Sequence, residues 1–335
     1  MLAGASAAGL RDEEGALLAR RPLRSAVRLI SPLPARKDSG GILRLAVIGD
    51  GERPSRASKL LLRAVKELGH SAYYVPLCAA SVGVSDAAPL RVGGHEVRVD
   101  GALLRALCGS ASLEQYLARY AMLKQAEMLG VTMVNSVDSV FTARNKYLTL
   151  LLAREAGVPV PDTVLTESLP AAYRVAKSWG DVVLKPILGS RGVGSVRFSD
   201  ADLAFSAMRV LKRWMQPLMV QRYVEKPGRD IRAFVVGSEV VAAMYRYAPP
   251  GSWKTNIAQG GRGAPCALSG ELEEVALRAA EALKLDYAGV DIAEGPEGPL
   301  LLEVNATADF EELMRVTGVN IPRRIVSRLV ERIKR

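Results

Sequence analysis

The sequence predicts an α/β unit followed by an α+β unit that contains antiparallel hairpins. The chain has 335 residues, 49% of them hydrophobic and 24% charged, which suits a globular protein of two domains or three small ones. Its first part alternates apolar, strand-like runs with helical segments. Its second part contains several runs rich in β-branched or aromatic residues, separated by short turns.

The α/β unit is expected to begin at Ile42 and to end near Val140. A turn with glycine follows the first strand, and glycines mark the ends of both helices. The predicted elements are a strand over 42–48, a turn at 49–51, a helix over 58–68, a helix over 113–129 and a strand over 131–134.

The α+β unit is expected to begin with a helix that Gly157 ends and that Pro159 and Pro161 keep from continuing. Gly237-Ser238 is a predicted two-residue hairpin turn. The predicted elements are helices over 145–156, 271–285 and 321–333, and strands over 182–185, 219–224, 231–236, 239–245, 287–293 and 300–305.

Residues 1–41 are expected to lie outside this fold. The segment is rich in Ala, Arg and Pro and shows no sustained hydrophobic period, so it is either a disordered tail or a start placed too far upstream. A mitochondrial transit peptide fits less well, because Asp12, Glu13 and Glu14 interrupt it.

The net charge of +10 invites a nucleic-acid-binding interpretation, but its distribution weakens that interpretation. Residues 1–41 contain seven Lys/Arg and four Asp/Glu, a net charge of +3, and residues 323–335 contain six Lys/Arg and one Glu, a net charge of +5. Only +2 remains for residues 42–322. Aromatic residues, 5% of the chain, offer few surfaces on which bases could stack. We therefore expect the basic ends to contact at most an acidic partner, and no nucleic acid to bind the body.

The cysteines and the hydropathy indicate a cytoplasmic protein. Cys78, Cys108 and Cys266 form no paired motif, which argues against a disulfide framework and a zinc ribbon. No apolar run reaches the roughly 18–20 residues that span a bilayer. Contact with a membrane is not expected.

The final predicted hairpin, residues 287–305, is the most informative pattern. Because side chains alternate along a strand, Glu303 and Asn305 share one face, while Leu302 and Val304 share the other. A turn centred in the middle of 294–299 places Asp291 opposite Glu303. Two carboxylates and an amide are therefore expected to converge.

Carboxylates so close together repel each other and require a cation, a proton or a water network. Hard divalent cations take carboxylate and amide oxygens, so Mg²⁺ suits Asp291, Glu303 and Asn305, whereas zinc would be expected to have His or Cys ligands. A solvated hairpin with ordinary surface acids remains the alternative.

A Gly-rich loop follows the predicted strand 182–185 and contains Gly189, Gly192 and Gly194. Glycines let successive backbone amides wrap around a phosphate, and Lys185 would bring positive charge to it. The loop lacks the Gly-Lys-Ser/Thr of a Walker A motif. A purely structural hairpin turn fits this pattern equally well.

Residues 221–232 form an apolar strand that breaks at Pro227-Gly228 and resumes with alternating charge. Such a break exposes backbone donors and acceptors of the kind that bind an adenine edge, and Asp230 and Arg232 are expected on one face. A surface connection with incidental charges is the alternative. Polar side chains that suit an anionic substrate surround the Gly-rich segment 259–263: Arg246, Lys254, Asn256 and Arg262.

Other residues are expected to have no chemical role. His70 and His95 lie beside glycines in predicted turns and supply neither a metal ligand nor a base. Trp179, Trp214 and Trp253 are predicted to be packing residues.

Taken in order, these segments resemble the ATP-grasp superfamily and, within it, the RimK-like amino-acid ligases, or α-L-glutamate ligases. The resemblance covers residues 42–335 and is strongest from Asn145 onward. It rests on Asn-Lys146-Tyr-Leu-Thr, Val-Val-Leu-Lys185-Pro, Gly-Ser-Arg-Gly-Val-Gly194, Gly-Arg-Asp230-Ile-Arg232, Trp-Lys254-Thr-Asn256, Asp291 and Glu303-Val-Asn305.

The resemblance implies an ATP-grasp fold after a Rossmann-like α/β subdomain. The Rossmann-like part would cover residues 42–140 and the ATP-grasp domain residues 141–335. Two α+β subdomains of the latter, about 141–218 and 219–335, would hold ATP between them.

The resemblance also implies roles for individual residues. ATP phosphates would lie near Lys146, Lys185, Gly189, Gly192, Gly194, Lys254 and Asn256. The adenine hinge would be Gln221, Arg222, Tyr223 and Val224, and the ribose would lie near Asp230. Asp291, Glu303 and Asn305 would hold Mg²⁺ or Mn²⁺, as two ions. Arg232, Arg246 and Asn256 would contact the substrate or the acylphosphate.

The implied reaction forms an amide through an acylphosphate. ATP phosphorylates a carboxylate, and an amine then displaces phosphate, so positioning supplies most of the catalysis and no covalent enzyme nucleophile is needed. The implied amine is glutamate or a similar amino acid, and the acceptor is a carboxylated cofactor or a protein. A homo-oligomer is compatible with this.

Two departures from the family pattern leave the acceptor open. Arg222 stands where relatives commonly have Glu, and Ala308-Asp309 where many glutamate ligases have Pro-Gly. Phe310, together with segments 223–228 and 317–322, resembles the LysX-like ligases of lysine and arginine biosynthesis, which act on an acidic carrier protein. The alternative from another class is a catalytically silent nucleotide-binding or nucleic-acid-binding protein.

Overall fold

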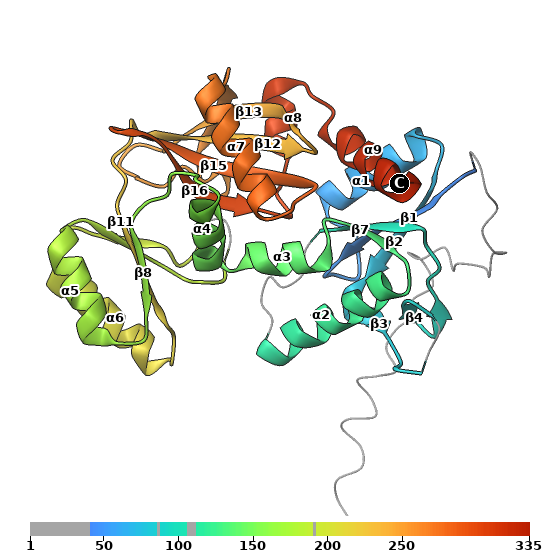
Figure 1. The fold of residues 1–335 in the computed structure, drawn as a ribbon, viewed down its shortest axis with the longest axis horizontal. Coiled ribbons are helices and arrows are strands. Elements are labelled where there is room, and N and C mark those ends of the chain that lie inside the picture. The colour runs from blue at the N-terminus through green and yellow to red at the C-terminus, as the bar shows by residue number, and fades with distance from the viewer. Residues whose placement is uncertain (1–40, 86–87, 106–111, 190–191) are drawn as a thin grey trace, which may run out of the picture.

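The computed structural model describes residues 41–85, 88–105, 112–189 and 192–335 (Figure 1). The predicted tail 1–41 falls outside them except for its last residue, as do Cys108 and residues 190–191. Figure 1 shows the first unit beside a large sheet, with a smaller unit at the opposite end. The described residues thus form three parts in space.

The first unit is built on a parallel sheet with the strand order β2-β1-β6-β7. Its strands and helices are β1 (Arg44–Gly49), α1 (Arg56–Glu67), β2 (Ser71–Pro76), η1 (Leu77–Ala79), β3 (Ala80–Ser81), β4 (Arg91–Val92), β5 (His95–Glu96), β6 (Gly101–Leu104), α2 (Leu113–Met128), β7 (Thr132–Val134) and α3 (Val137–Arg144). Both faces of β1 are buried, which explains its unbroken apolar sequence. The first predicted strand and both predicted helices of this unit are confirmed.

The middle unit is an antiparallel sheet with the order β10-β9-β11-β8, packed against two helices. Its elements, with the helix that precedes them, are α4 (Lys146–Glu155), β8 (Thr163–Thr166), α5 (Leu169–Trp179), β9 (Val182–Lys185), β10 (Val196–Phe198), α6 (Ala201–Arg213) and β11 (Leu218–Arg222). β8, α5, β10 and α6 were not predicted from the sequence. Signals for both helices were present, since Ser168 and Asp200 accept hydrogen bonds from the first backbone amides.

The third part is a five-stranded antiparallel sheet with the order β14-β13-β12-β15-β16. Its elements, with two final helices, are β12 (Arg229–Val236), β13 (Glu239–Tyr247), η2 (Ile257–Gln259), β14 (Arg262–Pro265), α7 (Gly270–Ala282), β15 (Tyr287–Gly295), β16 (Gly298–Asn305), α8 (Glu311–Thr317) and α9 (Ile321–Lys334). The predicted strands and the turn at Gly237-Ser238 are confirmed.

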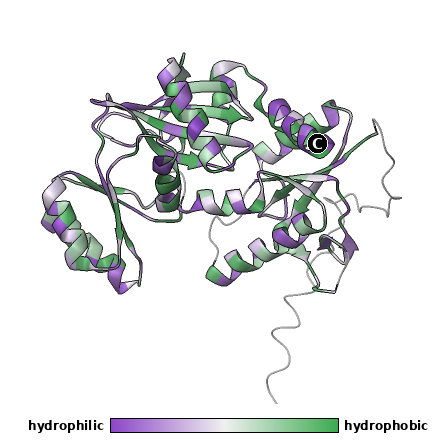
Figure 2. Ribbon diagram, viewed as in Figure 1, coloured by the Kyte–Doolittle hydropathy of each residue, from purple (hydrophilic) through white to green (hydrophobic). Residues whose placement is uncertain are grey.

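Alternation along the five-stranded sheet separates its two faces. Ile231, Val290 and Ile292 pack with α7 on one face, while Phe234 and Phe310 belong to a second apolar cluster on the other. Figure 2 shows hydrophobic residues along the strands and both kinds of residue along the helices. Asp230, Arg232 and Asp291 therefore lie on the face that α7 does not cover.

The last helix, α9, returns to the first unit. It packs on α1, β6 and β7, and a side chain at Gly101 would collide with Leu329 and Ile333. Part of its positive charge is neutralised within the chain, because Arg328 forms an ion pair with Asp286 at 2.8 Å. Among the described residues, no helix is both long and apolar enough to cross a membrane.

Candidate active site

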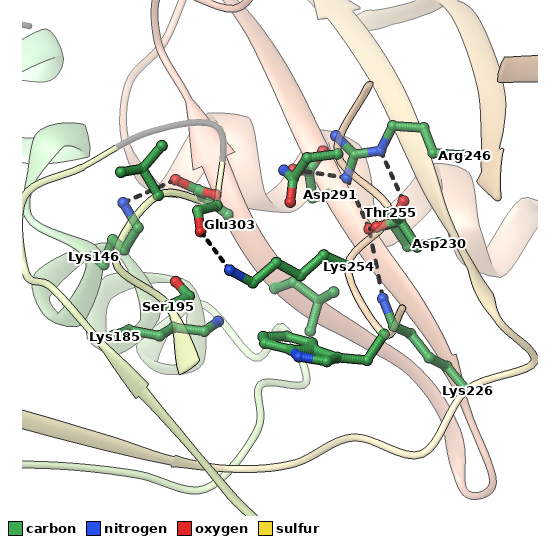
Figure 3. A pocket seen from close by; sticks show the side chains of 15 residues that line it. Lys146, Lys185, Ser195, Lys226, Asp230, Arg246, Lys254, Thr255, Asp291 and Glu303 are labelled. Carbon is green, nitrogen blue, oxygen red and sulfur yellow. Dashed lines mark hydrogen bonds and ion pairs between the residues drawn. The ribbon is translucent and has the colours of Figure 1, made fainter. Parts of the chain in front are cut away.

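A cavity with about 600 Å³ of empty space contains side chains from the middle unit and from the five-stranded sheet (Figure 3). Nine predicted site residues line it: Lys146, Lys185, Gly192, Asp230, Arg246, Lys254, Asn256, Asp291 and Glu303. The predicted residues that are not part of its lining are Gly189, Gly194, Gln221, Arg222, Tyr223, Val224, Arg232 and Asn305. Segments up to 157 residues apart thus meet in one place.

Lys146 connects the Gly-rich loop to the final hairpin. It is the first residue of α4, whose amino end is capped by the Asn145 side chain. Its Nζ donates a hydrogen bond to the carbonyl of Gly189 at 2.5 Å and lies 3.1 Å from a carboxylate oxygen of Glu303. A phosphate placed between these elements would meet this ammonium.

Two further lysines are buried, and burial disfavours their protonated, charged form. Burial lowers the pKa of Lys185 to about 8, and the positive charges of Lys146 and Lys226 add to this, while Glu303 opposes it. Burial also lowers the pKa of Lys226, whose side chain is 8% exposed and lies 3.8 Å from Asp230. An anion bound in the cavity would reverse these shifts.

The pKa of Lys185 predicts a pH dependence of nucleotide binding. A bound phosphate raises this pKa, so above pH 8 binding must be accompanied by proton uptake, and we expect the affinity for ADP to fall about tenfold per pH unit. Calorimetry at pH 7 to 9.5, in buffers of different ionisation enthalpy, measures both effects. Lys185→Arg keeps its charge throughout and should flatten the profile, whereas a flat profile in the unmodified protein contradicts the prediction.

Four charged residues on β12, β13 and β15 form a buried chain of ion pairs. Arg246 donates two hydrogen bonds to Asp230, at 2.7 and 2.8 Å, and lies 3.0 Å from Asp291. Arg232 donates two hydrogen bonds to Asp291, one of them at 2.9 Å. Burial raises the pKa of Asp291, but the two guanidinium groups outweigh it, so the pKa lies below its ordinary value. The two arginines thus neutralise part of the negative charge of the buried carboxylates.

This chain of ion pairs alters what was expected of Asp230. The resemblance implied a place beside the ribose, yet Asp230 is 3% exposed and accepts hydrogen bonds from Arg246 and from the Thr255 hydroxyl. A ribose hydroxyl would have to compete with both donors. The strand order, which puts β13 beside β12, brings Arg246 opposite Asp230.

The hairpin β15–β16 has the predicted register at its polar end. Asp291 is paired with Glu303, and Gly289 with Asn305. The expected position of Leu302 is wrong, because the register shifts by one residue between Asp291 and Ile292. This bulge leaves Leu302 without a pairing partner and puts it into the cavity wall beside Glu303 instead of on the face of Val304.

The donor set of this hairpin fits a hard divalent cation. Asp291 and Glu303 supply carboxylate oxygens, and the Asn305 amide nitrogen is buried without a hydrogen-bond partner among the described residues. The amide is therefore not held by the protein in a way that would prevent its oxygen from binding a metal. Three His, Cys, Asp or Glu side chains placed for a metal ion occur nowhere in the described segments, so a cage of such ligands is not formed there. Oxygen donors of protein and nucleotide together suit Mg²⁺.

The Gly-rich loop and the segment after β13 touch each other over the cavity. Lys254 Nζ donates a hydrogen bond to the carbonyl of Gly192 at 3.1 Å. Gly192 has φ of +69°, and a Cβ there would lie 2.4 Å from the Asn256 side-chain oxygen, so only glycine fits. Figure 3 shows the Lys254 side chain pointing toward Glu303.

The hinge residues 221–224 leave their side chains outside the cavity lining. Gln221 is buried and donates a hydrogen bond to Thr163, whereas Arg222 is exposed and lies 3.6 Å from Asp162. Contacts between adenine and the backbone of this segment would accommodate Arg222 in place of Glu.

Several residues of the cavity wall were not predicted from the sequence. Lys226 lies directly before Pro227-Gly228 in a motif already singled out, and this position was the signal that could have identified it. Trp253 packs edge-to-face against Tyr223, as expected of a packing residue, and also lines the cavity. Trp214 is 69% exposed and does not pack, while Trp179 packs as expected against the core of the middle unit. The other lining residues that were missed are Val193, Ser195, Thr255 and Leu302.

Comparison with known proteins places this geometry in a family. A model of the RimK-like ATP-grasp domain matches residues 143–329. The chain belongs to the RimK-like ATP-grasp family. It is 34% identical over 296 residues to the tetrahydromethanopterin:alpha-L-glutamate ligase of Methanosarcina acetivorans, covering 78% of this chain and 91% of that protein. It is 31% identical over 279 residues to the probable alpha-L-glutamate ligase of Serratia proteamaculans, covering 82% and 91%.

Solved structures confirm the ATP-grasp fold. The ATP-grasp ligase PsnB, in complex with a minimal precursor, matches with a TM-score of 0.69 at 23% identity, over 87% of this chain and 99% of PsnB. The D-cycloserine synthetase DcsG matches with a TM-score of 0.67 at 20% identity, over 88% and 100%. The protein is thus an ATP-dependent carboxylate–amine ligase of the RimK-like ATP-grasp family, as the resemblance implied.

Proposed function

We propose that the protein adds L-glutamate to a carboxylated acceptor through an acylphosphate, with ATP and Mg²⁺. The observation that carries this is the convergence of lysines from the middle unit on the carboxylates of β15 and β16 in one cavity. The similarity to α-L-glutamate ligases supports the choice of glutamate. A structure of PsnB contains both Mg and ADP, which supports the choice of cofactors.

Asp291, Glu303 and Asn305 are proposed to hold the metal, as two ions of Mg²⁺ or Mn²⁺. When bound, the metal would offset the negative charge of the nucleotide phosphates. Lys146, which lies 3.1 Å from Glu303, and Lys185 bind the phosphates. Their ammonium groups neutralise the negative charge of the phosphates. Because both lysine side chains are largely buried, each ammonium–phosphate interaction is stronger than it would be in bulk water.

The acceptor carboxylate attacks the γ-phosphorus of ATP, and ADP leaves. The amine then attacks the acyl carbon, phosphate leaves, and the amine nitrogen loses a proton. We propose that Arg246 and Asn256, which line the cavity, contact the transferring phosphoryl group. Arg232 lies behind Asp291 and outside the lining, so its proposed role is to orient that carboxylate.

We also propose the domain boundaries of the chain. Residues 42–140 form one domain and 141–335 the ATP-grasp domain, with a boundary near 218 between its two subdomains. The packing of α9 on the first sheet ties these domains together. The acceptor, whose identity the family leaves open, would lie where they meet.

An ADP-release assay with glutamate and a panel of acceptors tests the proposal. Because relatives are named for tetrahydromethanopterin, a carboxylated pterin cofactor is the first acceptor to test, followed by a deazaflavin, a protein C-terminus and an acidic amino-group carrier protein. We expect turnover that requires ATP, glutamate and one of these acceptors. Turnover with the carrier protein alone would favour a LysX-like ligase, and no turnover across the panel, with intact ADP binding, would contradict the proposal.

A further inference from the structure

The pairing of β15 with β16 ends at Gly289 and Asn305. Asn305 is thus the last paired residue of its strand, and the chain leaves the sheet directly after it. The Asn305 amide nitrogen has no hydrogen-bond partner among the residues that the structure describes. The orientation of this side chain therefore depends on the backbone of residues 305 and 306.

Beyond the last strand pair, a side chain of the first unit forms hydrogen bonds to the backbone on both sides of the hairpin. Asn135, the residue after β7, is fully buried. Its Nδ2 donates hydrogen bonds to the carbonyls of Tyr287 and Ala306, both at 2.8 Å, and its Oδ1 accepts one from the Tyr287 amide at 2.9 Å. A single amide thus bridges the open end of the hairpin where strand pairing has stopped.

Arg105, the residue after β6, holds the segment that follows. It donates hydrogen bonds to the Ala308 carbonyl at 2.8 Å and to the Asp309 carboxylate at 3.0 Å, and its guanidinium lies 5.3 Å from the centre of the Phe310 ring. Arg105 is 5% exposed. The path of the chain from Ala306 to Phe310 is therefore set by two side chains of the first unit.

Neither residue lines the cavity, so neither touches nucleotide there. We infer that Asn135 and Arg105 are positioning residues that hold Asn305, and with it the polar end of the hairpin, in the orientation that binds the metal. The inference rests on the proposed metal role of Asp291, Glu303 and Asn305. The first unit would thus contribute to metal binding, because residues that orient a metal ligand strongly affect the affinity of the site for the metal.

Binding of Mn²⁺ to the protein with saturating ADP, followed by electron paramagnetic resonance, tests the inference without turnover. We expect Asn135→Ala to raise the Kd of Mn²⁺ about tenfold and Arg105→Lys to raise it by a smaller factor, with high Mg²⁺ restoring kcat in both. Ser139→Ala is the matched control, because it removes a 3.0 Å hydrogen bond from the first unit to the Lys284 carbonyl, just before the hairpin. Its Kd should stay within about twofold of the unmodified protein.

Glu303→Gln separates this inference from the proposed function. Loss of Mn²⁺ binding in that variant, with an unchanged Kd in folded Asn135→Ala, overturns the inference alone. An unchanged Kd in Glu303→Gln overturns the metal assignment and the inference together. Equal weakening in Ser139→Ala also overturns the inference, because loosening of the interface would then explain it. If Asn135→Ala does not fold, Arg105→Lys decides by the same criteria.

Discussion

Glu303→Gln is expected to lower kcat about 1,000-fold, which corresponds to roughly 4 kcal/mol of transition-state stabilisation. Glutamine keeps the volume and one oxygen but removes the negative charge that the proposed metal requires. Glu303 lies at the cavity wall, 3.1 Å from Lys146, so its loss also leaves that ammonium without its ion pair. The measurement is ADP release under saturating substrates, with circular dichroism to confirm the fold.

Glu294→Gln is the matched control for this variant. Glu294 lies on the same hairpin and pairs with Arg229 at 2.8 Å, outside the cavity lining. Because this pair is partly exposed, its loss should cost less than about 1 kcal/mol of stability and leave kcat nearly unchanged. Full activity of Glu303→Gln would refute the metal assignment, and equal loss in both variants would show that the hairpin as a whole is sensitive to charge.

Arg246→Met is expected to lower the free energy of unfolding by about 3 kcal/mol, because it leaves two buried carboxylates without a shared partner. Arg246, Asp230 and Asp291 each have side chains 4% exposed. Burial alone lowers the pKa of Arg246, yet the two carboxylates raise it above the ordinary value, so the guanidinium stays charged. Lys226 and Arg232 remain near the carboxylates. The loss of unfolding free energy is therefore expected at the lower end of the range for broken buried ion pairs.

Chemical denaturation with a spectroscopic readout measures this loss, and Arg222→Met is the control. Arg222 lies 3.6 Å from Asp162, and their side chains are 59% and 63% exposed. Water screens such a pair, so the control should change stability by no more than about 0.5 kcal/mol. Similar destabilisation by both substitutions would show that the buried chain of ion pairs does not contribute as argued.

Local rules predicted the hairpin and its polar face from sequence. Alternation along two strands and a short central turn were enough to pair Asp291 with Glu303. The same rules failed at Leu302, because a bulge changes the register without any residue that signals it locally. Prediction of strand faces is thus reliable only as far as the first irregularity in pairing.

Partners that come from distant strands could not be predicted. Which cation meets which carboxylate depends on strand order. Because β13 lies beside β12, Arg246 lies opposite Asp230, and its guanidinium also lies 3.0 Å from Asp291 on β15. Nothing in the neighbourhood of Asp230 in the sequence indicates that its oxygens are already engaged. The roles implied for Asp230 and Arg232 were altered for this reason.

The sequence by itself determined many of the strands and helices, through periodicity and turn residues. Its ordered short motifs resembled one family and indicated most of the residues that line the cavity. Only the tertiary structure decided that Leu302 lines the cavity and that α9 packs on the first sheet. It also decided that Asn135 and Arg105 donate hydrogen bonds to the backbone just after the hairpin. The physical reason is that local patterns act between residues a few positions apart. Hydrogen bonds and ion pairs between units are instead selected by which buried polar groups the folded chain brings within 3 Å of each other.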